Sequence, residues 1–378
     1  ARQPVRAREP VRSRRPGRSP RPARSPGGTM TSSTVPSSSS SLMFPESTAT
    51  PLRGGPALRW GVIGTGEIAG DFTDALHAHT DQRVVAVSSR TLDKAERFAA
   101  SHGVATAVEG QEALVALAEV DVVYVATPHT SHVPDALLAI DAGKHVLVEK
   151  PFATTTEEAD RLIAAARAAG VLAMEAMWTR YVPHSTVLAR LLADGAIGDV
   201  RLATADVAWA NDLSSGGRMA DPSLGGGALL DIGVYAVWFA QFAIGRPVDV
   251  RATGTTRADG VDLEAAIALR TAEGRVGTAV TSLLTTSPGL GTISGSTGTV
   301  RMLEHLVFPA SFEVSTAAGT ATWHDPSVLR GRDGLAYEAT ALAAFVAEGR
   351  TDSPLHSLDD ARSVTAVLEA TRASLTVV

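Results

Sequence analysis

The sequence predicts an α/β fold in two parts: a doubly wound parallel sheet over residues 58–177, then an α+β domain with an open, mostly antiparallel sheet over residues 178–378. Three observations lead to this prediction. Short apolar runs alternate with helical stretches up to residue 177. A glycine-rich turn joins the first apolar run to the first helical stretch. Beyond residue 177, strand-like runs follow one another with short turns between them.

The first part reads as strands and helices in alternation. Residues 120–126 (VDVVYVA) form an almost continuous apolar run, as expected for a strand that is covered on both faces. The other expected strands are residues 58–63, 83–88, 104–108, 145–148 and 171–175. The helices expected between them end near residues 79, 101, 118, 142 and 169.

The second part begins with an expected helix over residues 183–194 and a long strand over 199–210. A glycine-rich loop leads to a helix expected over residues 227–242. Five strands are expected next, at residues 248–257, 263–271, 275–284, 291–296 and 299–303. Helices over residues 335–348 and 358–371 close the chain.

Residues 1–57 differ from the rest in composition. They are rich in Pro and Ser and hold ten arginines and two acids, which leaves 24 basic and 38 acidic residues for the remainder. Such a leader cannot bury enough apolar surface to offset its ordering entropy, so we expect disorder. Residues 1–29 read as translated sequence upstream of Met30, with a transit peptide and a basic nucleic-acid arm as weaker alternatives. No apolar segment follows Arg14-Arg15, which excludes a twin-arginine signal.

Composition also excludes several classes of protein. The chain has no cysteine, so disulfides, thiolate zinc sites and a cysteine nucleophile are excluded. The acidic excess beyond residue 57 argues against nucleic acid as a partner. No apolar run reaches the roughly 18–20 residues that span a bilayer, so no membrane partner is expected. We expect a cytoplasmic protein.

The glycine-rich turn has the pattern G-x-G-x-x-A, formed by Gly64, Gly66 and Ala69. Gly64 allows the tight turn, Gly66 lets the backbone approach a pyrophosphate, and Ala69 lets the helix pack closely on the strand. The helix N-terminus supplies N–H donors and a partial positive charge. The turn therefore predicts a dinucleotide-binding Rossmann domain, in which further cofactor contacts come from Thr65, Glu67 and Ile68.

The end of the second strand indicates which dinucleotide binds. An NAD enzyme places a carboxylate there, on the ribose 2′-hydroxyl. This chain has Ser89 and Arg90 instead. A serine can hydrogen-bond a 2′-phosphate, and an arginine can pair with it and stack on adenine. The sequence thus favours NADP, with NAD as the alternative.

Glu149-Lys150-Pro151 follows directly on the strand over residues 145–148. Ligands of doubly wound sheets lie at the carboxyl ends of the strands, so Lys150 should face the cofactor crevice. Only three lysines occur in the chain, against 31 arginines, which gives this position additional weight. Pro151 fixes the chain as it leaves the strand, and its peptide bond is a candidate for the cis form.

Together these motifs resemble the Gfo/Idh/MocA oxidoreductases. The resemblance rests on the glycine turn, Thr127-Pro128, Glu149-Lys150-Pro151 and the stretch GGGALLDIGVY over residues 225–235. Within that family, residues 175–181 (EAMWTRY) and Tyr235 resemble the branch of the dimeric dihydrodiol dehydrogenases and NADP-dependent D-xylose dehydrogenases. Many other members carry His where this chain has Tyr235.

The resemblance implies roles for three residues. Lys150 would contact the cofactor and would bind and polarise the reacting oxygen. Tyr235 would be the general acid/base, with its phenol acidified by Lys150. Asp231, four residues earlier, would share a helix face with Tyr235 and bind a substrate hydroxyl or orient the site. Structural interpretations remain open: Tyr235 as a core residue and Asp231 as a cap or a structural partner.

Other positions carry weaker expectations. Thr127, Pro128 and His129 should border the nicotinamide end, and His132 should contact the cofactor or cap the following helix. Glu149 is expected at the nicotinamide ribose. Trp178 and Arg180 are expected to approach the substrate, although Trp178 is equally compatible with core packing.

The sequence therefore predicts an NADP-dependent dehydrogenase that acts on a sugar, polyol or cyclic diol and forms a homo-oligomer, a dimer or a tetramer. A metal-dependent alcohol dehydrogenase is a poor alternative, because the ten histidines are scattered, and no metal site is expected. A non-catalytic NADP-binding regulator would be expected to lose Lys150 or the pair Asp231 and Tyr235. A redox-neutral NAD-dependent glycosidase of the same superfamily is opposed by Ser89 and Arg90.

Overall fold

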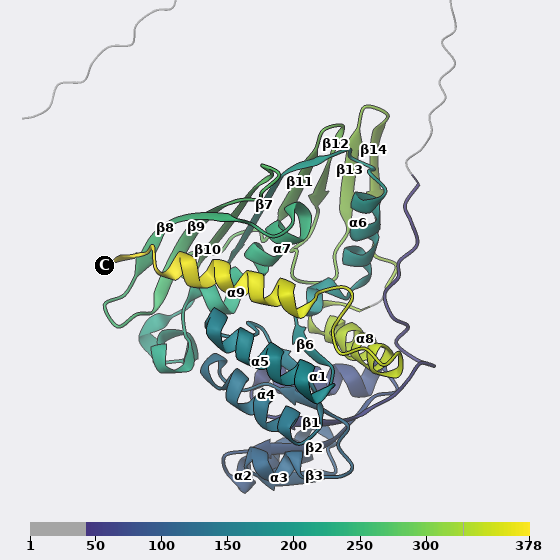
Figure 1. Cartoon of the computed structure of the whole chain (residues 1–378), viewed down its shortest axis with the longest axis vertical. Coiled ribbons are helices and arrows are strands. Elements are labelled where there is room, and N and C mark those ends of the chain that lie inside the picture. Colours follow the sequence, from purple (N-terminus) through teal and green to yellow (C-terminus); the bar gives the residue numbers. More distant parts are fainter. Residues whose placement is uncertain (1–42, 328) are drawn as a thin grey trace, which may run out of the picture. The chain divides into compact units, whose positions relative to one another are not determined.

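The computed structural model describes residues 43–327 and 329–378. These residues hold two sheets, one of six strands and one of nine (Figure 1). The six-stranded sheet is entirely parallel, and the nine-stranded sheet is mixed and mostly antiparallel. The predicted fold class is therefore confirmed.

The parallel sheet has the strand order β3-β2-β1-β4-β5-β6. Its strands are β1 Arg59–Ile63, β2 Arg83–Ser89, β3 Thr106–Glu109, β4 Val122–Val125, β5 His145–Glu149 and β6 Ala173–Ala176. Its helices are α1 Glu67–His79, α2 Leu92–His102, α3 Gln111–Val115, α4 His132–Asp141 and α5 Thr156–Ala169. The strand order reverses between β1 and β4, and such a switch point opens a ligand crevice at the carboxyl ends of the strands.

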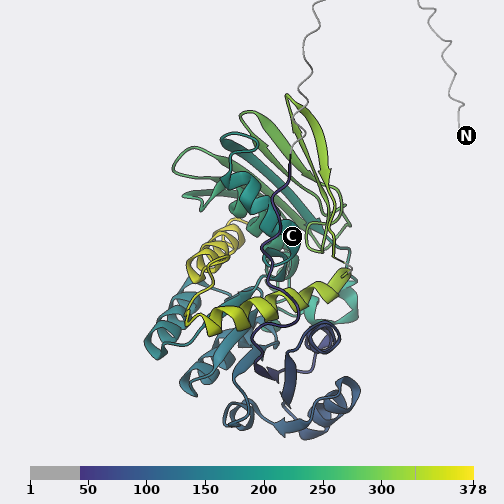
Figure 2. The ribbon, with the colours of Figure 1, turned by 90° about the vertical axis from the view of Figure 1, so that its right-hand side faces the viewer.

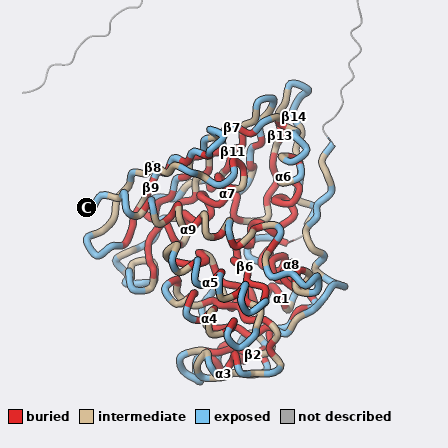
Figure 3. The backbone as a smooth tube through the Cα atoms, viewed as in Figure 1, coloured by how far each residue is buried: buried red, intermediate tan, exposed pale blue. Residues whose placement is uncertain are grey.

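Helices cover both faces of this sheet. Tyr124 of β4 packs with Phe72 of α1 on one face, while Val123 packs with Val133 of α4 and Leu162 of α5 on the other. The alternation of strand side chains between faces thus feeds two separate apolar clusters. Figure 3 accordingly colours most of the central part of this sheet red, as buried.

The second sheet has the order β14-β13-β12-β11-β7-β10-β9-β8-β15. Its strands are β7 Val200–Ala208, β8 Asp249–Thr256, β9 Asp262–Arg270, β10 Val276–Ser282, β11 Gly291–Gly295, β12 Gly298–Met302, β13 Phe312–Thr316, β14 Gly319–Trp323 and β15 Thr376–Val377. The pairs β7/β10 and β8/β15 are parallel. The sequence interpretation missed β13, β14 and β15, which have only five, five and two residues.

Four helices belong to the second part: α6 Pro183–Ala193, α7 Val234–Ile244, α8 Leu335–Ala347 and α9 Leu358–Arg372. Helix α7 packs on β7 and β10 and is covered by α9 on its other side. Helices α8 and α9 return to the first part, where α8 packs on α1 and α9 on α5 (Figures 1 and 2). The C-terminal segment therefore ties the two sheets together.

One expectation about hydropathy needs correction. Residues Pro222–Ile244, which include α7, are long and apolar enough to cross a membrane by length and composition, with a mean hydropathy of 1.5. However, 89% of this window is buried inside the protein. The segment is apolar because α7 lies between a sheet and another helix, as a core helix does.

The predicted disorder of residues 1–57 is wrong for residues 43–57. The ring of Phe44 lies 5.8 Å from that of Phe312, edge to face. The hydroxyls of Ser47 and Thr186 are 2.9 Å apart, and Arg53 pairs with Asp81. Composition hid these few anchoring side chains. The rest of the leader lies outside the described residues.

Candidate active site

The glycine turn has the geometry of a phosphate cradle. Gly64 has φ +112°, and an added Cβ would lie 2.4 Å from the carbonyl oxygen of Ala126, so only glycine fits. Gly66 precedes α1 as its N-cap, and an added Cβ there would enter open space. No side chain of the described residues caps this helix end. The first-turn N–H groups are therefore free for a pyrophosphate, and the turn fits a dinucleotide.

The end of β2 lies beside this turn. The hydroxyls of Ser89 and Thr65 are 3.3 Å apart, which connects the two predicted contact residues. Arg90 is exposed, and its guanidinium has no ion pair in the part of the chain that the structure describes. Glu67 is not similarly free, because it pairs with Arg332 at 2.7 Å. Ser89 and Arg90 are thus available to a 2′-phosphate.

The end of β4 places Thr127 and Pro128, both half-buried, at the switch point. The hydroxyl of Thr127 donates to Asp135 at 2.8 Å. His132 is fully buried, and its ring nitrogens lie 2.8 and 2.9 Å from the carbonyl oxygens of Pro151 and Thr127. The ring thus joins the ends of β4 and β5, and the predicted contact of His132 with the cofactor stays a prediction. The ring does not cap α4.

Lys150 emerges at the end of β5, and its peptide bond to Pro151 is cis. Its ammonium Nζ donates to the carbonyl oxygen of Asp231 at 2.6 Å and lies 3.4 Å from the Asp231 carboxylate. The same Nζ lies 5.0 Å from the centre of the Tyr235 ring. The structure thus brings together the three residues that the sequence singled out for chemistry.

Asp231 is the centre of a cluster of charges. Its Oδ1 accepts from Arg218 at 2.8 Å and lies 3.6 Å from Nε2 of His129. Burial alone would raise the pKa of Asp231, but the cations Lys150 and Arg218 outweigh it and hold this pKa well below its ordinary value. The carboxylate is therefore ionised at neutral pH and cannot act as a proton donor.

His129 is a neutral member of this cluster. Burial lowers the pKa of its ring, although Asp231 opposes the shift. Its Nδ1 donates to the carbonyl oxygen of Gly225 at 2.8 Å, which leaves Nε2 to accept from Arg218 at 3.3 Å. Two cations, Lys150 and Arg218, therefore face one carboxylate. The excess positive charge suits an oxygen on which negative charge develops.

The sequence interpretation did not find Arg218. It lies in the glycine-rich loop between β7 and α7, thirteen residues before Asp231, where no periodic pattern marks it. Arg218 is the one basic residue of this loop, and that was the available signal.

The segment that carries Asp231 departs from the predicted regular helix. Residues Leu229–Gly233 form a π-helical turn, and α7 begins at Val234. Gly227 before it has φ +125°, and an added Cβ there would lie 2.4 Å from the carboxylate of Asp262. Such turns often occur at functional sites because they alter the direction of side chains. Here the turn presents both a carbonyl and a carboxylate of Asp231 to Lys150.

The predicted acidification of Tyr235 is wrong. Burial raises the pKa of its phenol well above the ordinary value, and the carboxyl of Glu149 adds to the shift. The ammonium of Lys150 lies over the face of the ring and does not outweigh these two effects. The phenol is therefore protonated at neutral pH.

Trp178 belongs to the short turn Trp178–Arg180 after β6. Its Nε1 donates to the phenol oxygen of Tyr235 at 3.0 Å, and only 3% of the residue is exposed. It fixes the position of Tyr235 from within the core. Because the phenol oxygen accepts from Trp178, its own O–H remains free to donate elsewhere.

Arg180 does not approach the substrate side as predicted. Its Nε donates to the carbonyl oxygen of Leu355 at 3.0 Å, and its guanidinium carbon lies 5.1 Å from the centre of the Phe242 ring. Phe242 is near the C-terminal end of α7, whereas Tyr235 is at its start. In a turn with three residues per helical turn, residues two apart point about 120° away from each other, so Trp178 and Arg180 reach different ends of this helix.

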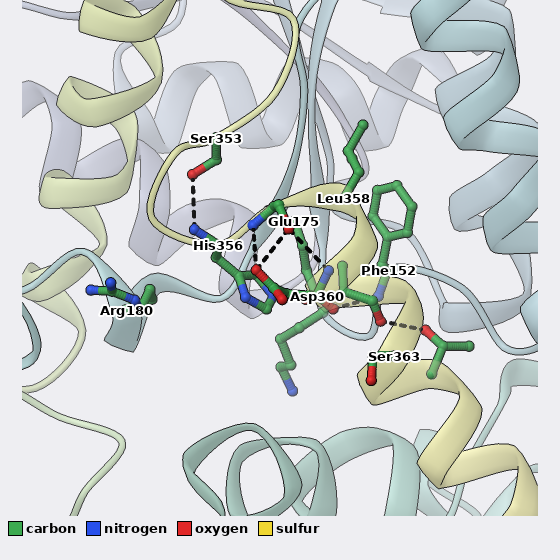
Figure 4. A network of polar contacts seen from close by, with 12 residues as sticks. Phe152, Glu175, Arg180, Ser353, His356, Leu358, Asp360 and Ser363 are labelled. Atoms are coloured by element: carbon green, nitrogen blue, oxygen red, sulfur yellow. Dashed lines mark hydrogen bonds and ion pairs between the residues drawn. The ribbon is translucent and has the colours of Figure 1, made fainter. Parts of the chain in front are cut away.

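A second polar network holds the backbone around Lys150 (Figure 4). Glu175 at the end of β6 accepts from the backbone N–H of Phe152 at 2.7 Å, and its other oxygen lies 2.7 Å from Nε2 of His356. Glu149 accepts from Tyr124 at 2.5 Å and from the N–H of Lys150 at 3.1 Å. Both oxygens of Glu149 are thus engaged inside the protein, and its contact with a ribose stays a prediction.

Two family models match this chain. Residues 58–177 match the family model described as "Oxidoreductase family, NAD-binding Rossmann fold", and residues 186–301 match the Gfo/Idh/MocA C-terminal domain. The chain belongs to the Gfo/Idh/MocA oxidoreductase family. In this Gfo/Idh/MocA protein, the matched regions carry the glycine turn, Lys150, Asp231 and Tyr235.

Several relatives align with this chain over nearly the whole of their own length. A trans-1,2-dihydrobenzene-1,2-diol dehydrogenase from Danio rerio is 35% identical over 85% of this chain and 98% of its own. The structure of a 3-ketoreductase from Actinomadura kijaniata with NADP and TDP-benzene is 30% identical, with a TM-score of 0.74 over 85% of this chain and 99% of its own. A levoglucosan dehydrogenase complex with NADH is similar in fold, with 22% identity and a TM-score of 0.77 over 84% and 97%.

Proposed function

We propose that this protein is an NADP-dependent dehydrogenase that interconverts a carbinol and a carbonyl on a sugar, polyol or cyclic diol. The observation that carries the proposal is the position of the Lys150 ammonium, 2.6 Å from the Asp231 carbonyl and 5.0 Å from the Tyr235 ring, at the strand edge where the glycine turn lies. The names of the relatives, a diol dehydrogenase and a ketoreductase, support this substrate class.

The cofactor supplies the redox chemistry, since its nicotinamide accepts or donates a hydride. Gly64 and Gly66 would hold its pyrophosphate against the N-terminus of α1, and Ser89 and Arg90 would hold the 2′-phosphate. Arg90 supports NADP over NAD because it is exposed and unpaired among the described residues.

The chain's own side chains handle the reacting oxygen. Lys150 donates a hydrogen bond to it from Nζ and thereby polarises the carbon–oxygen bond. Tyr235 exchanges a proton with the same oxygen through its phenol O–H, which the Trp178 contact leaves free. Asp231 stays ionised and orients Lys150 and Arg218. Positioned proton transfer of this kind contributes about 10²–10⁴ in rate.

The protonated state of Tyr235 sets a direction with pH. A phenol with a raised pKa is a proton donor at neutral pH, so it serves carbonyl reduction there. Carbinol oxidation needs the phenolate as acceptor and therefore accelerates as the pH rises toward the phenol pKa.

We further propose a cytoplasmic homodimer that forms through the open face of the nine-stranded sheet. Leu202 of β7 is the direct neighbour of Val276 on β10. Val280 lies four residues further along β10, on the same face of the sheet. All three apolar side chains are exposed, by 38%, 40% and 43%. An apolar stripe of this kind supports contact with a second copy, and light scattering on the purified protein measures the mass.

The proposed reaction is tested with a panel of aldoses, inositols and cyclic diols, together with their keto forms. Each is incubated with NADP or NADPH, and with NAD or NADH in parallel, while absorbance at the nicotinamide band is recorded. We expect turnover with at least one member of the panel and a preference for NADP. Product formation without any change in external cofactor would instead indicate a redox-neutral reaction and contradict the proposal.

A further inference from the structure

A second cavity lies at the far end of α7 from Tyr235. Its volume is about 430 Å³, and it is bounded by α6, the C-terminal half of α7 and the segment before α9. Neither Lys150, Asp231 nor Tyr235 lines it. Cavities of this size hold small organic ligands in other proteins. We call it the Arg180 cavity, after the buried cation in its wall.

Arg180 is the unusual member of this wall. Only 8% of the residue is exposed, and the one hydrogen bond of its side chain to another described residue runs from Nε to the carbonyl oxygen of Leu355. In the described part of the chain, Nη1 is buried without any partner, and no carboxylate lies within ion-pair distance of the guanidinium. Burial lowers the pKa of Arg180, which reflects the cost of holding an uncompensated cation in the interior.

The other charges around the cavity do not compensate Arg180. Arg246 also lines it, but Asp360 accepts from Nε of Arg246 at 2.8 Å, and Asp359 lies 3.8 Å from Nη1. His356 turns its Nε2 to Glu175, away from Arg180, as Figure 4 shows. Asp360 is thus engaged by Arg246, and Asp359 also pairs with Arg167 at 3.1 Å, so these two carboxylates serve two other arginines and the positive charge of Arg180 remains in excess. A ligand with a single negative charge fits this balance.

The remaining wall is largely apolar. The rings of Trp238 and Phe242 stack with centroids 5.5 Å apart and an interplanar angle of 20°. Leu192 of α6 and Ala243 of α7 continue this surface. An inorganic anion would leave that surface without a partner, whereas the apolar body of an organic anion would cover it.

We propose that the Arg180 cavity binds a small organic carboxylate, which pairs with the Arg180 guanidinium and packs its apolar body against Trp238 and Phe242. A carboxylate offers two oxygens to the guanidinium fork, a geometry that gives strong, charge-assisted hydrogen bonds. The site is separate from the proposed hydride-transfer site, so it can be occupied while cofactor and substrate are bound.

Calorimetric titration of the full chain at constant ionic strength, without cofactor, tests this site. Benzoate is the probe, benzyl alcohol is the uncharged match for its ring, and inorganic phosphate is an anion without an apolar body. Arg180→Met removes the cation, and Ala189→Leu fills the cavity from α6 while Arg180 stays in place. Arg190→Met removes an exposed arginine of the same helix as the matched control. Lys150→Met removes the lysine of the hydride-transfer site.

We expect benzoate to bind the wild-type chain with Kd of about 1 mM or tighter. Arg180→Met and Ala189→Leu should each weaken binding by about tenfold or more. Arg190→Met and Lys150→Met should leave it unchanged. If Arg180→Met does not fold, Ala189→Leu alone decides the result.

Three results would overturn the proposal. Failure of the wild-type chain to bind benzoate is the first. The second is binding that Lys150→Met abolishes and Ala189→Leu does not, since this would place benzoate in the hydride-transfer site. The third is tighter binding of phosphate or benzyl alcohol than of benzoate, which would contradict the carboxylate class. None of these results depends on whether the proposed dehydrogenase activity is found.

Discussion

The two ends of the crevice along the parallel sheet are built in different ways. The nucleotide end depends mainly on backbone conformation: Gly64 permits a close turn against Ala126, Gly66 leaves open space at an uncapped helix, and Arg90 is exposed. At the chemical end, side chains from distant segments hold one another, as Arg218, His129 and Lys150 do around Asp231. A local motif suffices to build the first end, whereas the second needs the complete fold.

This difference predicts which function each end loses when it is changed. Substitutions at the chemical end should reduce turnover and leave cofactor binding intact. Substitutions at the nucleotide end should weaken cofactor binding and leave turnover at saturating cofactor nearly intact. The following variants test this division.

Tyr235→Phe should give the largest effect, a loss of about 10²–10⁴ in kcat, because it removes the proton that the reacting oxygen exchanges. In the wild type, carbonyl reduction should be flat between about pH 6 and 9, since the raised pKa keeps the phenol protonated. Oxidation should rise by about tenfold per pH unit over the same range. Steady-state rates in both directions measure this.

Tyr337→Phe is the matched control, because it removes a phenol hydroxyl from α8, outside the site. It should retain wild-type rates. An oxidation rate that is already level at pH 7, or a Tyr235→Phe variant with more than a tenth of the wild-type kcat, would contradict the assigned role of Tyr235.

Arg218→Met should lower kcat by about 10- to 100-fold. It removes one of the two cations around Asp231 whose excess positive charge stabilises negative charge on the reacting oxygen. The dissociation constant of NADPH, measured by fluorescence, should not change. Arg251→Met, an exposed arginine on β8, is the control. A variant that binds NADPH poorly and turns over normally would reverse the proposed division.

Arg90→Ala should weaken NADP binding by about tenfold and leave NAD binding unchanged, since only NADP carries the 2′-phosphate. Arg97→Ala changes an exposed arginine of α2, the helix that follows Arg90, and should bind both cofactors as the wild type does. If Arg90→Ala weakened the binding of NADP and of NAD equally, Arg90 would stabilise the cofactor-binding domain instead of contacting the 2′-phosphate.

Glu338→Gln shows what a buried carboxyl costs when no cation accompanies it, in contrast to Asp231. Glu338 on α8 is fully buried, and its oxygens have no hydrogen-bond partner among the described residues. Burial raises its pKa well above the ordinary value, so the wild type loses stability as the pH rises above the unfolded-state pKa of about 4.3. The variant should therefore gain about 1 kcal/mol or more in unfolding free energy relative to the wild type as the pH rises from about 4 to 8. A constant difference across this range in urea titrations would contradict the shift.

The same contrast explains what the sequence could predict. The glycine turn, the end of β2 and Glu149-Lys150-Pro151 are local, so their positions at the strand edge follow from the order of elements alone. The fold class follows from the alternation of apolar runs. Neither pattern predicts which side chain of a turn faces the ligand.

Nonlocal contacts account for the errors. Arg218 reaches Asp231 through a loop without periodicity, and the π-helical turn changes the direction of Asp231. His132 does not cap α4 because two backbone carbonyls receive its ring. Burial, which depends on the complete fold, reverses the expected shift of the Tyr235 pKa. Residues 43–57 are anchored by partners far along the sequence, such as Thr186 and Phe312.

The central claim is that Lys150 acts on the reacting oxygen and not on the cofactor. Lys150→Met tests it most directly, with NADPH binding and single-turnover reduction measured on the same preparation. We predict an NADPH dissociation constant within about threefold of the wild type and a turnover lower by about 10² or more. Turnover above about a tenth of the wild-type value, with NADPH bound, would contradict the claim.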